Sequence, residues 1–470
     1  MSLSANIARL TVIQIIARVV SVGFGVYLVY LVLHYLDPGN FGRYSLVSSI
    51  IQILATVADF GLYLIATKQI SDSTKDQCRE FSSVLTFRVV SALGFLLLLI
   101  IGAFFSPYDR TVKIGIIATS GMFFGLVMNQ LLLSIFQKFH ETNKYAFIEL
   151  GSKALMTSLT FVFIYFRLGV LYLLEALLIA TVAQTILLFF FARKYLPFRM
   201  NFNLAPLKKV WSESWPLALS VIFTTVYFRG DTLALSWLKP VRDVGIYNAA
   251  FRVFETLLGF PILFIGLVLP YLGSTFLSGN LEGFRHYFRK AFDGMIVLTL
   301  PLITTLIVLA TPIMDFLAGS EYKDSARLLQ ILMVALLVAY LGILPAHAIT
   351  IIGKQKLMMY FYFASALISL GIYYFFIPRF GYWAAAWTTV IAQSIIMISS
   401  QVIITIKTRA LPDFSVFLKC LIAGFISGSV MKLFIYLPFW LNATIGGVVY
   451  GLLVVAFRVI KTKEIREFIT

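Results

Sequence analysis

Cysteine and histidine are scarce in this 470-residue chain, and so are charged side chains. The 2 cysteines, Cys78 and Cys420, lie far apart in the sequence, so we expect no disulfide framework. The 4 histidines are scattered without the spacing of metal ligands. Charged residues form 13% of the chain, about half of their share in soluble domains. These scarcities exclude an ordinary water-soluble protein and a disulfide-stabilised secreted domain, and they predict no metal centre.

Sequence motifs of enzymatic chemistry are also missing. The chain contains no P-loop pattern for ATP hydrolysis, and no Asp-x-Asp motif of the kind that many sugar-nucleotide transferases use. The longest polar breaks, around residues 193–210 and 273–290, are too short for a soluble domain. We therefore expect that the protein is not an enzyme and has no catalytic residues and no cofactor.

Apolar sequence, in contrast, is abundant. Hydrophobic residues form 60% of the chain, and they occur in runs of about 20, the length that crosses the hydrocarbon core of a bilayer. The pattern predicts an all-α integral membrane protein with about fourteen transmembrane helices. The predicted spans are 10–35, 44–67, 82–105, 114–136, 146–166, 170–192, 212–237, 246–272, 291–317, 328–351, 357–377, 382–406, 414–437 and 441–459.

Positive charges outnumber negative charges, since the chain has 38 Lys and Arg against 21 Asp and Glu. With the N-terminus in the cytoplasm, the cytoplasmic loops hold more than twice as many Lys and Arg as the outer loops, which is the positive-inside pattern. An even number of spans then places both termini in the cytoplasm. Topology thus accounts for the excess charge, and we expect no nucleic-acid partner. The first apolar run contains Arg18 and is too long for a cleaved signal segment, so we expect it to be retained.

Three short segments recur in the same order in the second half of the chain. Residues 36–44 match 238–247 in a Leu-x-Pro and Gly-x-Tyr pattern, 167–169 match 379–381, and 182–186 match 391–395. Six spans per copy is an even number, so both copies have the same orientation and a pathway is expected between them. We predict a six-helix lobe over 1–209, a homologous lobe over 210–410, and two additional helices with a cytoplasmic tail over 411–470.

Several of these segments resemble a known family. The segments are Leu36–Tyr44, Ala58-Asp59-Phe60-Gly61-Leu62, Arg229-Gly230-Asp231 and Gly245-x-Tyr247-x-x-Ala250-x-Arg252. Together with the layout of six, six and two spans, they resemble bacterial polysaccharide flippases of the Wzx type. These flippases belong to the multidrug/oligosaccharidyl-lipid/polysaccharide exporter superfamily.

The resemblance implies a two-lobed transporter with a central cavity in the bacterial cytoplasmic membrane. It implies that undecaprenyl-diphosphate-linked oligosaccharide units move from the inner to the outer leaflet by alternating access. O-antigen, capsule and exopolysaccharide synthesis all stay open. A polysaccharide polymerase and a chain-length regulator are candidate partners, which the last two helices could bind; alternatively, these helices guide the lipid tail.

Four arginines inside the predicted spans are candidates for a cationic cavity that binds the diphosphate: Arg18, Arg88, Arg229 and Arg252. Arginine suits phosphate because its planar guanidinium is permanently charged. Alternatively, these arginines form structural ion pairs and do not bind substrate. Arg252 and Glu255 are three residues apart, and Glu149 and Lys153 are four apart, so each pair shares a helix face and can neutralise itself.

Four carboxylates inside the spans are candidates for coupling transport to a proton or sodium gradient: Asp59, Asp231, Glu175 and Asp293. Buried carboxylates can carry protons because burial favours their neutral form. Alternatively, Asp231 is held by Arg229 or Arg18, and Asp59 caps a helix break at Gly61.

Other functions stay possible at this point. A lipid II flippase or a cation-coupled multidrug antiporter would belong to the same superfamily. A membrane polysaccharide polymerase or glycosyltransferase commonly carries a large outer loop, and no such loop is present in the sequence.

Overall fold

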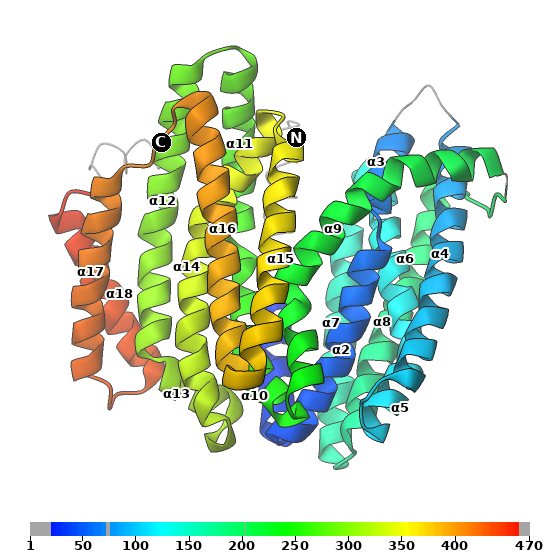
Figure 1. Cartoon of the computed structure of the whole chain (residues 1–470), viewed down its shortest axis with the longest axis horizontal. Helices are drawn as coiled ribbons and strands as arrows, with labels where there is room; N and C mark the ends of the chain where they lie inside the picture. Colours follow the sequence, from blue (N-terminus) through cyan, green and yellow to red (C-terminus); the bar gives the residue numbers. More distant parts are fainter. Residues whose placement is uncertain (1–19, 72–75, 203, 460–470) are drawn as a thin grey trace, which may run out of the picture. The chain divides into compact units, whose positions relative to one another are not determined.

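The computed structural model describes residues 20–71, 76–202 and 204–459, and the described chain is helical throughout. A first helix, Val20–Tyr35, precedes those labelled in Figure 1. The next helices are α2 (Pro38–Ala58), α3 (Leu62–Ser71), α4 (Gln77–Phe105), α5 (Arg110–Ala118), α6 (Ser120–Lys138), α7 (Thr142–Tyr165), α8 (Val170–Tyr195) and α9 (Leu204–Leu238). They are followed by α10 (Val241–Leu258), α11 (Phe260–Leu277), α12 (Leu281–Val308), α13 (Ala310–Ala318), a 3-10 turn over Ser320–Tyr322, α14 (Lys323–Ile351), α15 (Gln355–Phe380), α16 (Tyr382–Thr408), α17 (Phe414–Leu433) and α18 (Phe439–Ala456).

Among the described residues, 12 helical segments are long and apolar enough to cross a membrane. Each coincides with one of the predicted spans, which confirms a multi-pass, all-helical membrane protein. The predicted spans 10–35 and 212–237 are not among the twelve. Residues 10–19 of the first lie outside the described residues, and its described part, Val20–Tyr35, is a shorter apolar helix. The span 212–237 lies in the 35-residue helix α9, where charged residues interrupt the apolar sequence.

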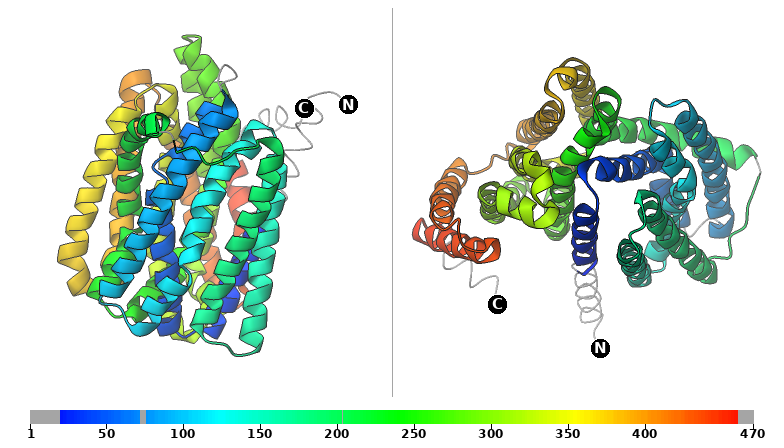
Figure 2. Two further views of the ribbon diagram at one scale, coloured as in Figure 1. Left: turned by 90° about the vertical axis from the view of Figure 1, so that its right-hand side faces the viewer. Right: turned by 90° about the horizontal axis from the view of Figure 1, so that it is seen from below.

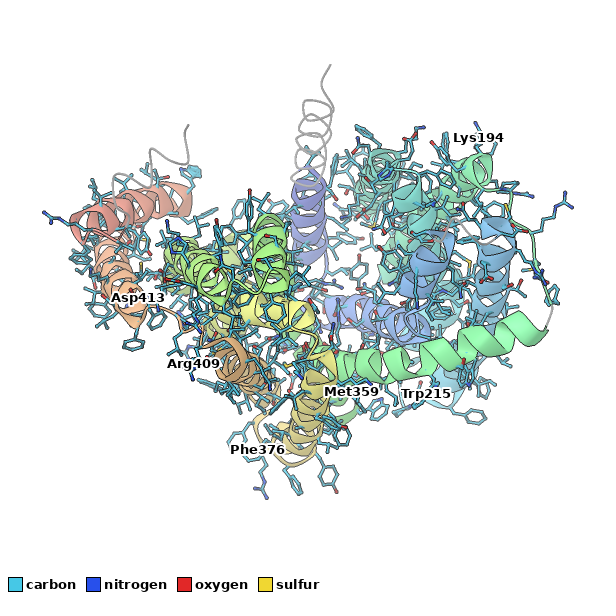
Figure 3. All side chains as sticks on the ribbon, turned by 90° about the horizontal axis from the view of Figure 1, so that it is seen from above. Lys194, Trp215, Met359, Phe376, Arg409 and Asp413 are labelled. Atoms are coloured by element: carbon cyan, nitrogen blue, oxygen red, sulfur yellow. The ribbon has the colours of Figure 1, made fainter. Side chains whose placement is uncertain are left out.

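Polar side chains fix where several helices begin. Asp37, Asp76, Asp109 and Asp413 precede α2, α4, α5 and α17, and each carboxylate accepts hydrogen bonds from backbone N–H groups of the first turn. Such caps satisfy donors that have no partner within the helix. Figure 3 labels Asp413 and also Arg409, the residue with left-handed backbone that ends α16. The apolar runs therefore become separate helices at defined residues.

The chain divides into two compact units, residues 1–245 and 246–470. In the first unit α2 packs against α6, α8 and α9, and α7 packs mainly against α8. In the second unit α14 packs closely on α16, and α12 contacts α14 and α17. Within each unit the long helices run side by side (Figures 1 and 2). The predicted lobes and the internal repeat stay predictions.

The recurring sequence segments occupy comparable places in the chain. Residues 36–44 and 238–247 each join the end of one long helix to the start of the next, α2 and α10. Residues 167–169 form the turn between α7 and α8, and 379–381 form the turn between α15 and α16. Arg167 and Gly381 have positive φ angles of 54° and 56°. The first two matched pairs therefore lie at helix junctions, whereas the third pair, 182–186 and 391–395, lies inside α8 and α16.

Candidate functional site

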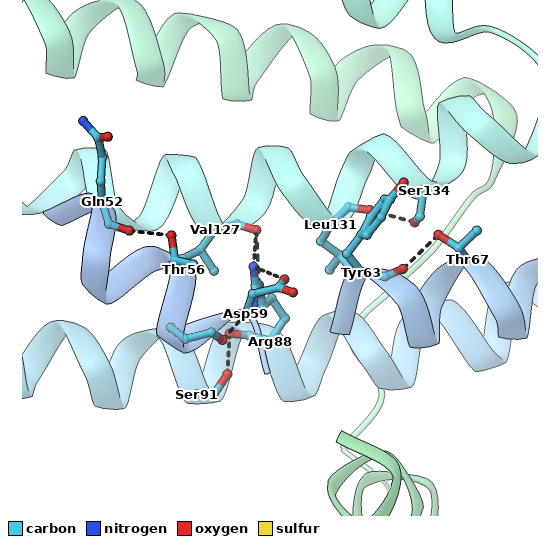
Figure 4. Close-up of polar contacts among 11 residues, drawn as sticks. Gln52, Thr56, Asp59, Tyr63, Thr67, Arg88, Ser91, Val127, Leu131 and Ser134 are labelled. Carbon is cyan, nitrogen blue, oxygen red and sulfur yellow. Dashed lines mark hydrogen bonds and ion pairs between the residues drawn. The ribbon is translucent and has the colours of Figure 1, made fainter. Parts of the chain in front are cut away.

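A buried arginine joins three helices of the first unit. The Arg88 side chain, from the middle of α4, is fully buried. Its Nη2 lies 2.9 Å from the Asp59 Oδ1. Its Nη1 donates to the Ala58 carbonyl at 2.7 Å, and its Nε and Nη2 donate to the Val127 carbonyl of α6 at 3.2 and 2.9 Å. Figure 4 shows this cluster at the end of α2. These four contacts come from one guanidinium group, so a single side chain ties α4 to α2 and α6.

The cluster lies at a break between two helices. Asp59 ends α2, and α3 begins at Leu62. Phe60 and Gly61 between them have positive φ angles of 49° and 70°, a conformation that is costly for a side-chain-bearing residue such as phenylalanine. The break leaves the Ala58 carbonyl without a helical partner, and the Arg88 guanidinium supplies one. Arg88 therefore stabilises a discontinuous span.

This geometry bears on two sequence predictions. Arg88 has no exposed surface, so in this structure it contacts protein groups and not an open cavity. Asp59 is also buried, beside Gly61 as the alternative interpretation expected, and its carboxylate is paired with Arg88. Substrate binding by Arg88 and ion coupling by Asp59 stay predictions, and the contacts favour a positioning role for both residues.

Two further ion pairs lie inside spans. In α7 the Lys153 Nζ is 3.3 Å from the Glu149 Oε1, and it donates to the Ser21 hydroxyl at 2.7 Å. In α10 the Arg252 Nη1 is 3.2 Å from the Glu255 Oε2. Both pairings were predicted from their spacing. Their side chains stay between a fifth and a third exposed, unlike the Arg88 pair.

The remaining candidates are spread over several helices. Arg18 lies outside the described residues. In α9 Asp231 is buried and accepts a hydrogen bond from the Thr232 N–H at 2.6 Å, while Arg229 is half-buried. Glu175 in α8 and Asp293 in α12 are both half-buried. Among described residues, no group of three or more His, Cys, Asp or Glu side chains could hold a metal ion.

Gly42 and Gly245 belong to the matched segments 36–44 and 238–247. Within the first unit, each of these glycines lies against the backbone of the other segment. A Cβ atom added to Gly42 would lie 2.0 Å from the Val241 carbonyl oxygen, and one added to Gly245 would lie 1.9 Å from the Pro38 carbonyl oxygen. The contact is reciprocal, because Pro38 and Val241 each lie four residues before the glycine of their own segment, Gly42 and Gly245. Only glycine permits backbones to approach this closely.

Two cavities lie in the first unit, near the predicted outer ends of its helices. One, of about 480 Å³, is lined by Tyr35 and Leu36, Asn40, Thr111 and residues 169–172. The other, of about 490 Å³, is largely apolar and lies between α2, α4, α5 and α9. The Tyr108 hydroxyl at its edge is 2.9 Å from the Ser236 hydroxyl. Neither cavity contains the predicted cationic residues.

Sequence reasoning missed the partners of Arg88. The pairing with Asp59 bridges two helices, and no regular spacing indicates it. The available signal was the presence of two opposite charges inside neighbouring spans, since an isolated charge there is costly. The backbone carbonyls that complete the site have no sequence signature at all.

The described residues form membrane-spanning helices with a broken span and paired intramembrane charges. Solved structures share this fold. A lipid II flippase, MurJ, in an inward closed conformation is similar with a TM-score of 0.80 and 18% identity, over 95% of this chain and 99% of that chain. An inward-facing multidrug resistance MATE family transporter of the MOP superfamily is similar with a TM-score of 0.68 and 16% identity, over 85% and 98% of the two chains.

Sequence comparison identifies the family. The model of the "Polysaccharide biosynthesis protein" family matches residues 3–276, more than half of the chain. A second model, "MatE", matches residues 216–375. A Shigella flexneri protein named "Putative O-antigen transporter" is 22% identical over 374 residues, which are 75% of this chain and 86% of that protein. The chain belongs to the polysaccharide biosynthesis protein family.

Proposed function

We propose that this protein is a flippase for undecaprenyl-diphosphate-linked oligosaccharide units. It moves them from the inner to the outer leaflet of the bacterial cytoplasmic membrane by alternating access. The observation that carries this proposal is the family match over residues 3–276 in a chain whose fold resembles a lipid II flippase along 95% of its length. The name of the Shigella flexneri relative supports O-antigen units as the substrate, ahead of capsule or exopolysaccharide units.

The charges inside the spans support an anionic lipid-linked substrate. A diphosphate crossing a low-dielectric region needs positive partners, and arginine and lysine supply them by charge-assisted hydrogen bonds. Among the predicted cationic residues, Arg229 and Arg252 are half-buried rather than sealed, and Arg18 lies outside the described residues. These three are the proposed cationic residues of the path. Glu175, Asp231 and Asp293 stay candidates for coupling to a proton or sodium gradient.

A cation-coupled multidrug antiporter is the second candidate. The MatE match over residues 216–375 and the similarity to a MATE transporter favour it. The helices α17 and α18 lie beyond that matched segment and beyond the two predicted six-helix lobes, which favours the flippase. A polysaccharide polymerase and a chain-length regulator are proposed as partners at these helices.

The deciding experiment uses a strain that lacks the gene. Undecaprenyl-linked intermediates are extracted, and the leaflet that holds them is determined with an impermeant sugar-modifying reagent. Complete units accumulating in the inner leaflet, with outward movement restored by the gene, would support the flippase and identify its sugars. Unchanged lipid-linked sugars would contradict the proposal and favour the drug exporter. Complete but unpolymerised units in the outer leaflet would contradict it in favour of a polymerase.

A further inference from the structure

The ion pair of α7 lies where a charge is most costly in a membrane helix. Lys153 is in the middle of the 24-residue helix Thr142–Tyr165, so each end of the span is roughly 17 Å away at 1.5 Å per residue. That distance is too great for a lysine side chain to reach the interface by snorkelling. The Lys153 and Glu149 side chains are nevertheless 32% and 31% exposed. Charges at this depth face a partner or a water-filled space, and this pair has both a partner and open surface.

Open space lies beside the Ser21 partner of Lys153. An added Cβ atom at Gly25, four residues after Ser21 and on the same face of the Val20–Tyr35 helix, would meet no atom within 4 Å. The Ser21 hydroxyl accepts a hydrogen bond from Lys153. The Val20–Tyr35 helix is held to α7 and α8 a second time, because the Tyr35 hydroxyl donates to the Leu168 carbonyl at 2.8 Å.

The hydrogen-bonding capacity of Lys153 is not exhausted. An ammonium group has three donors, and among the described residues this one has two partners, the Glu149 carboxylate and the Ser21 hydroxyl. Within the described part of the chain, one donor is therefore left for a ligand on the exposed side. An anionic ligand of higher charge than a carboxylate can in addition replace Glu149, since both compete for the same ammonium group.

We propose that Lys153, with Ser21 and Glu149, forms a phosphate-binding subsite midway through the path, in which the lipid-linked diphosphate replaces Glu149 as the partner of Lys153. The empty transporter then holds a neutral pair at mid-span, and the loaded transporter holds a lysine–phosphate pair in its place. This inference rests on the proposed function, because it takes the lipid diphosphate as substrate.

The test measures binding of farnesyl diphosphate and of farnesol to the purified full-length protein in nanodiscs. The alcohol reports the prenyl chain alone, so the difference between the two affinities reports the diphosphate. Lys153→Met should weaken diphosphate binding about tenfold, equivalent to about 1.4 kcal/mol, and leave farnesol binding unchanged. Lys153→Arg should retain most of the affinity. Glu149→Gln should strengthen diphosphate binding, because the competing carboxylate is gone.

The matched control is another Glu–Lys pair on the same helix. Lys144 lies 3.0 Å from Glu141 in the first turn of α7, and its side chain is more exposed than that of Lys153. Lys144→Met should therefore leave the affinity for farnesyl diphosphate unchanged. If the pair were purely structural, Lys153→Met and Glu149→Gln would change the affinity for farnesyl diphosphate in the same direction. The proposed exchange requires that they change it in opposite directions.

The outcomes separate this inference from the proposed function. If the wild-type protein moves lipid-linked sugars and binds farnesyl diphosphate, but Lys153→Met binds it as tightly, the subsite is overturned and the flippase stands. Weakened binding in both the Lys153→Met and Glu149→Gln variants overturns the exchange. If the gene moves no lipid-linked sugar, the proposed function fails whatever these variants bind.

Discussion

At the scale of single residues, a charge inside a span is explained by what surrounds its side chain. Arg88 and Lys153 both lie near the middle of long apolar helices. The first is fully buried against a carboxylate and two backbone carbonyls, and the second is a third exposed beside a carboxylate and a hydroxyl. Full burial against protein groups favours a structural and positioning role for Arg88. Open surface and a spare donor make Lys153 a ligand-binding candidate.

Replacing Arg88 by Met should destabilise the protein strongly. The change leaves the Asp59 carboxylate buried without its charged partner, which typically costs about 3–5 kcal/mol. Thermal unfolding in detergent should show a much lower melting temperature. Arg88→Lys should recover only part of the lost stability, because a lysine ammonium group cannot reach all of the partners of the guanidinium.

The control for this prediction is Arg252→Met. The ion pair of Arg252 with Glu255 is partly exposed, so the loss of stability in this variant should be much smaller. An Arg88→Met protein as stable as the wild type would show that the cluster does not hold α2, α4 and α6 together.

A double variant tests the pairing itself. Asp59→Asn combined with Arg88→Met removes both charges, so the unpaired carboxylate no longer exists. We expect the double variant to be more stable than Arg88→Met alone, in a double-mutant cycle of unfolding free energies. Additive losses would mean that the two side chains do not interact.

At the scale of elements, α17 and α18 form a closely packed hairpin on α12. The Ser427 hydroxyl donates to the Gly446 carbonyl at 2.8 Å, and the buried Asn442 amide donates to the Met431 and Phe434 carbonyls at the end of α17. Small residues permit the docking on α12, since Cβ atoms added to Gly424 and Gly428 would lie about 3 Å from Thr304. Such small-residue contacts are a common means of helix association in membranes.

Gly424→Val should loosen the hairpin from α12. Overpacking of this kind usually costs about 1–3 kcal/mol, and a disulfide engineered between positions 304 and 428 should form less readily in the variant. Gly447→Val is the control, because an added Cβ there meets nothing within 4 Å. Equal crosslinking in both variants would contradict the packing.

At the scale of the whole molecule, the internal repeat has a physical counterpart in the reciprocal contact of Gly42 and Gly245. Gly42→Ala and Gly245→Ala should each impair transport and lower stability by about 1–3 kcal/mol, and to a similar extent, because each Cβ would collide with a backbone oxygen that cannot rotate away. Transport is measured as surface glycan per amount of inserted protein. Gly94→Ala, with open space around it, should behave as the wild type. If both variants behaved as the wild type, the contact would have no role in transport.

The amino-acid sequence by itself determined the class of structure. Runs of apolar residues at bilayer length define membrane helices regardless of packing, because the cost of exposing polar groups to hydrocarbon is local. Residue spacing along one helix also predicted the pairs Glu149–Lys153 and Arg252–Glu255, since residues three or four apart always share a face. The family resemblance was likewise readable from short segments, and the same segments predict an internal repeat.

Only the tertiary structure decided which charges are sealed and which are accessible. The pairing of Arg88 with Asp59 and with two carbonyls depends on how α2, α4 and α6 pack, and the reciprocal approach of Gly42 and Gly245 depends on backbones far apart in the sequence. The burial of a side chain depends on neighbours contributed by other helices, and the spacing of residues along one helix does not specify them. For that physical reason the sequence placed Arg88 among the substrate-binding candidates and left Lys153 out, whereas the packed helices give Arg88 a positioning role and Lys153 an open face.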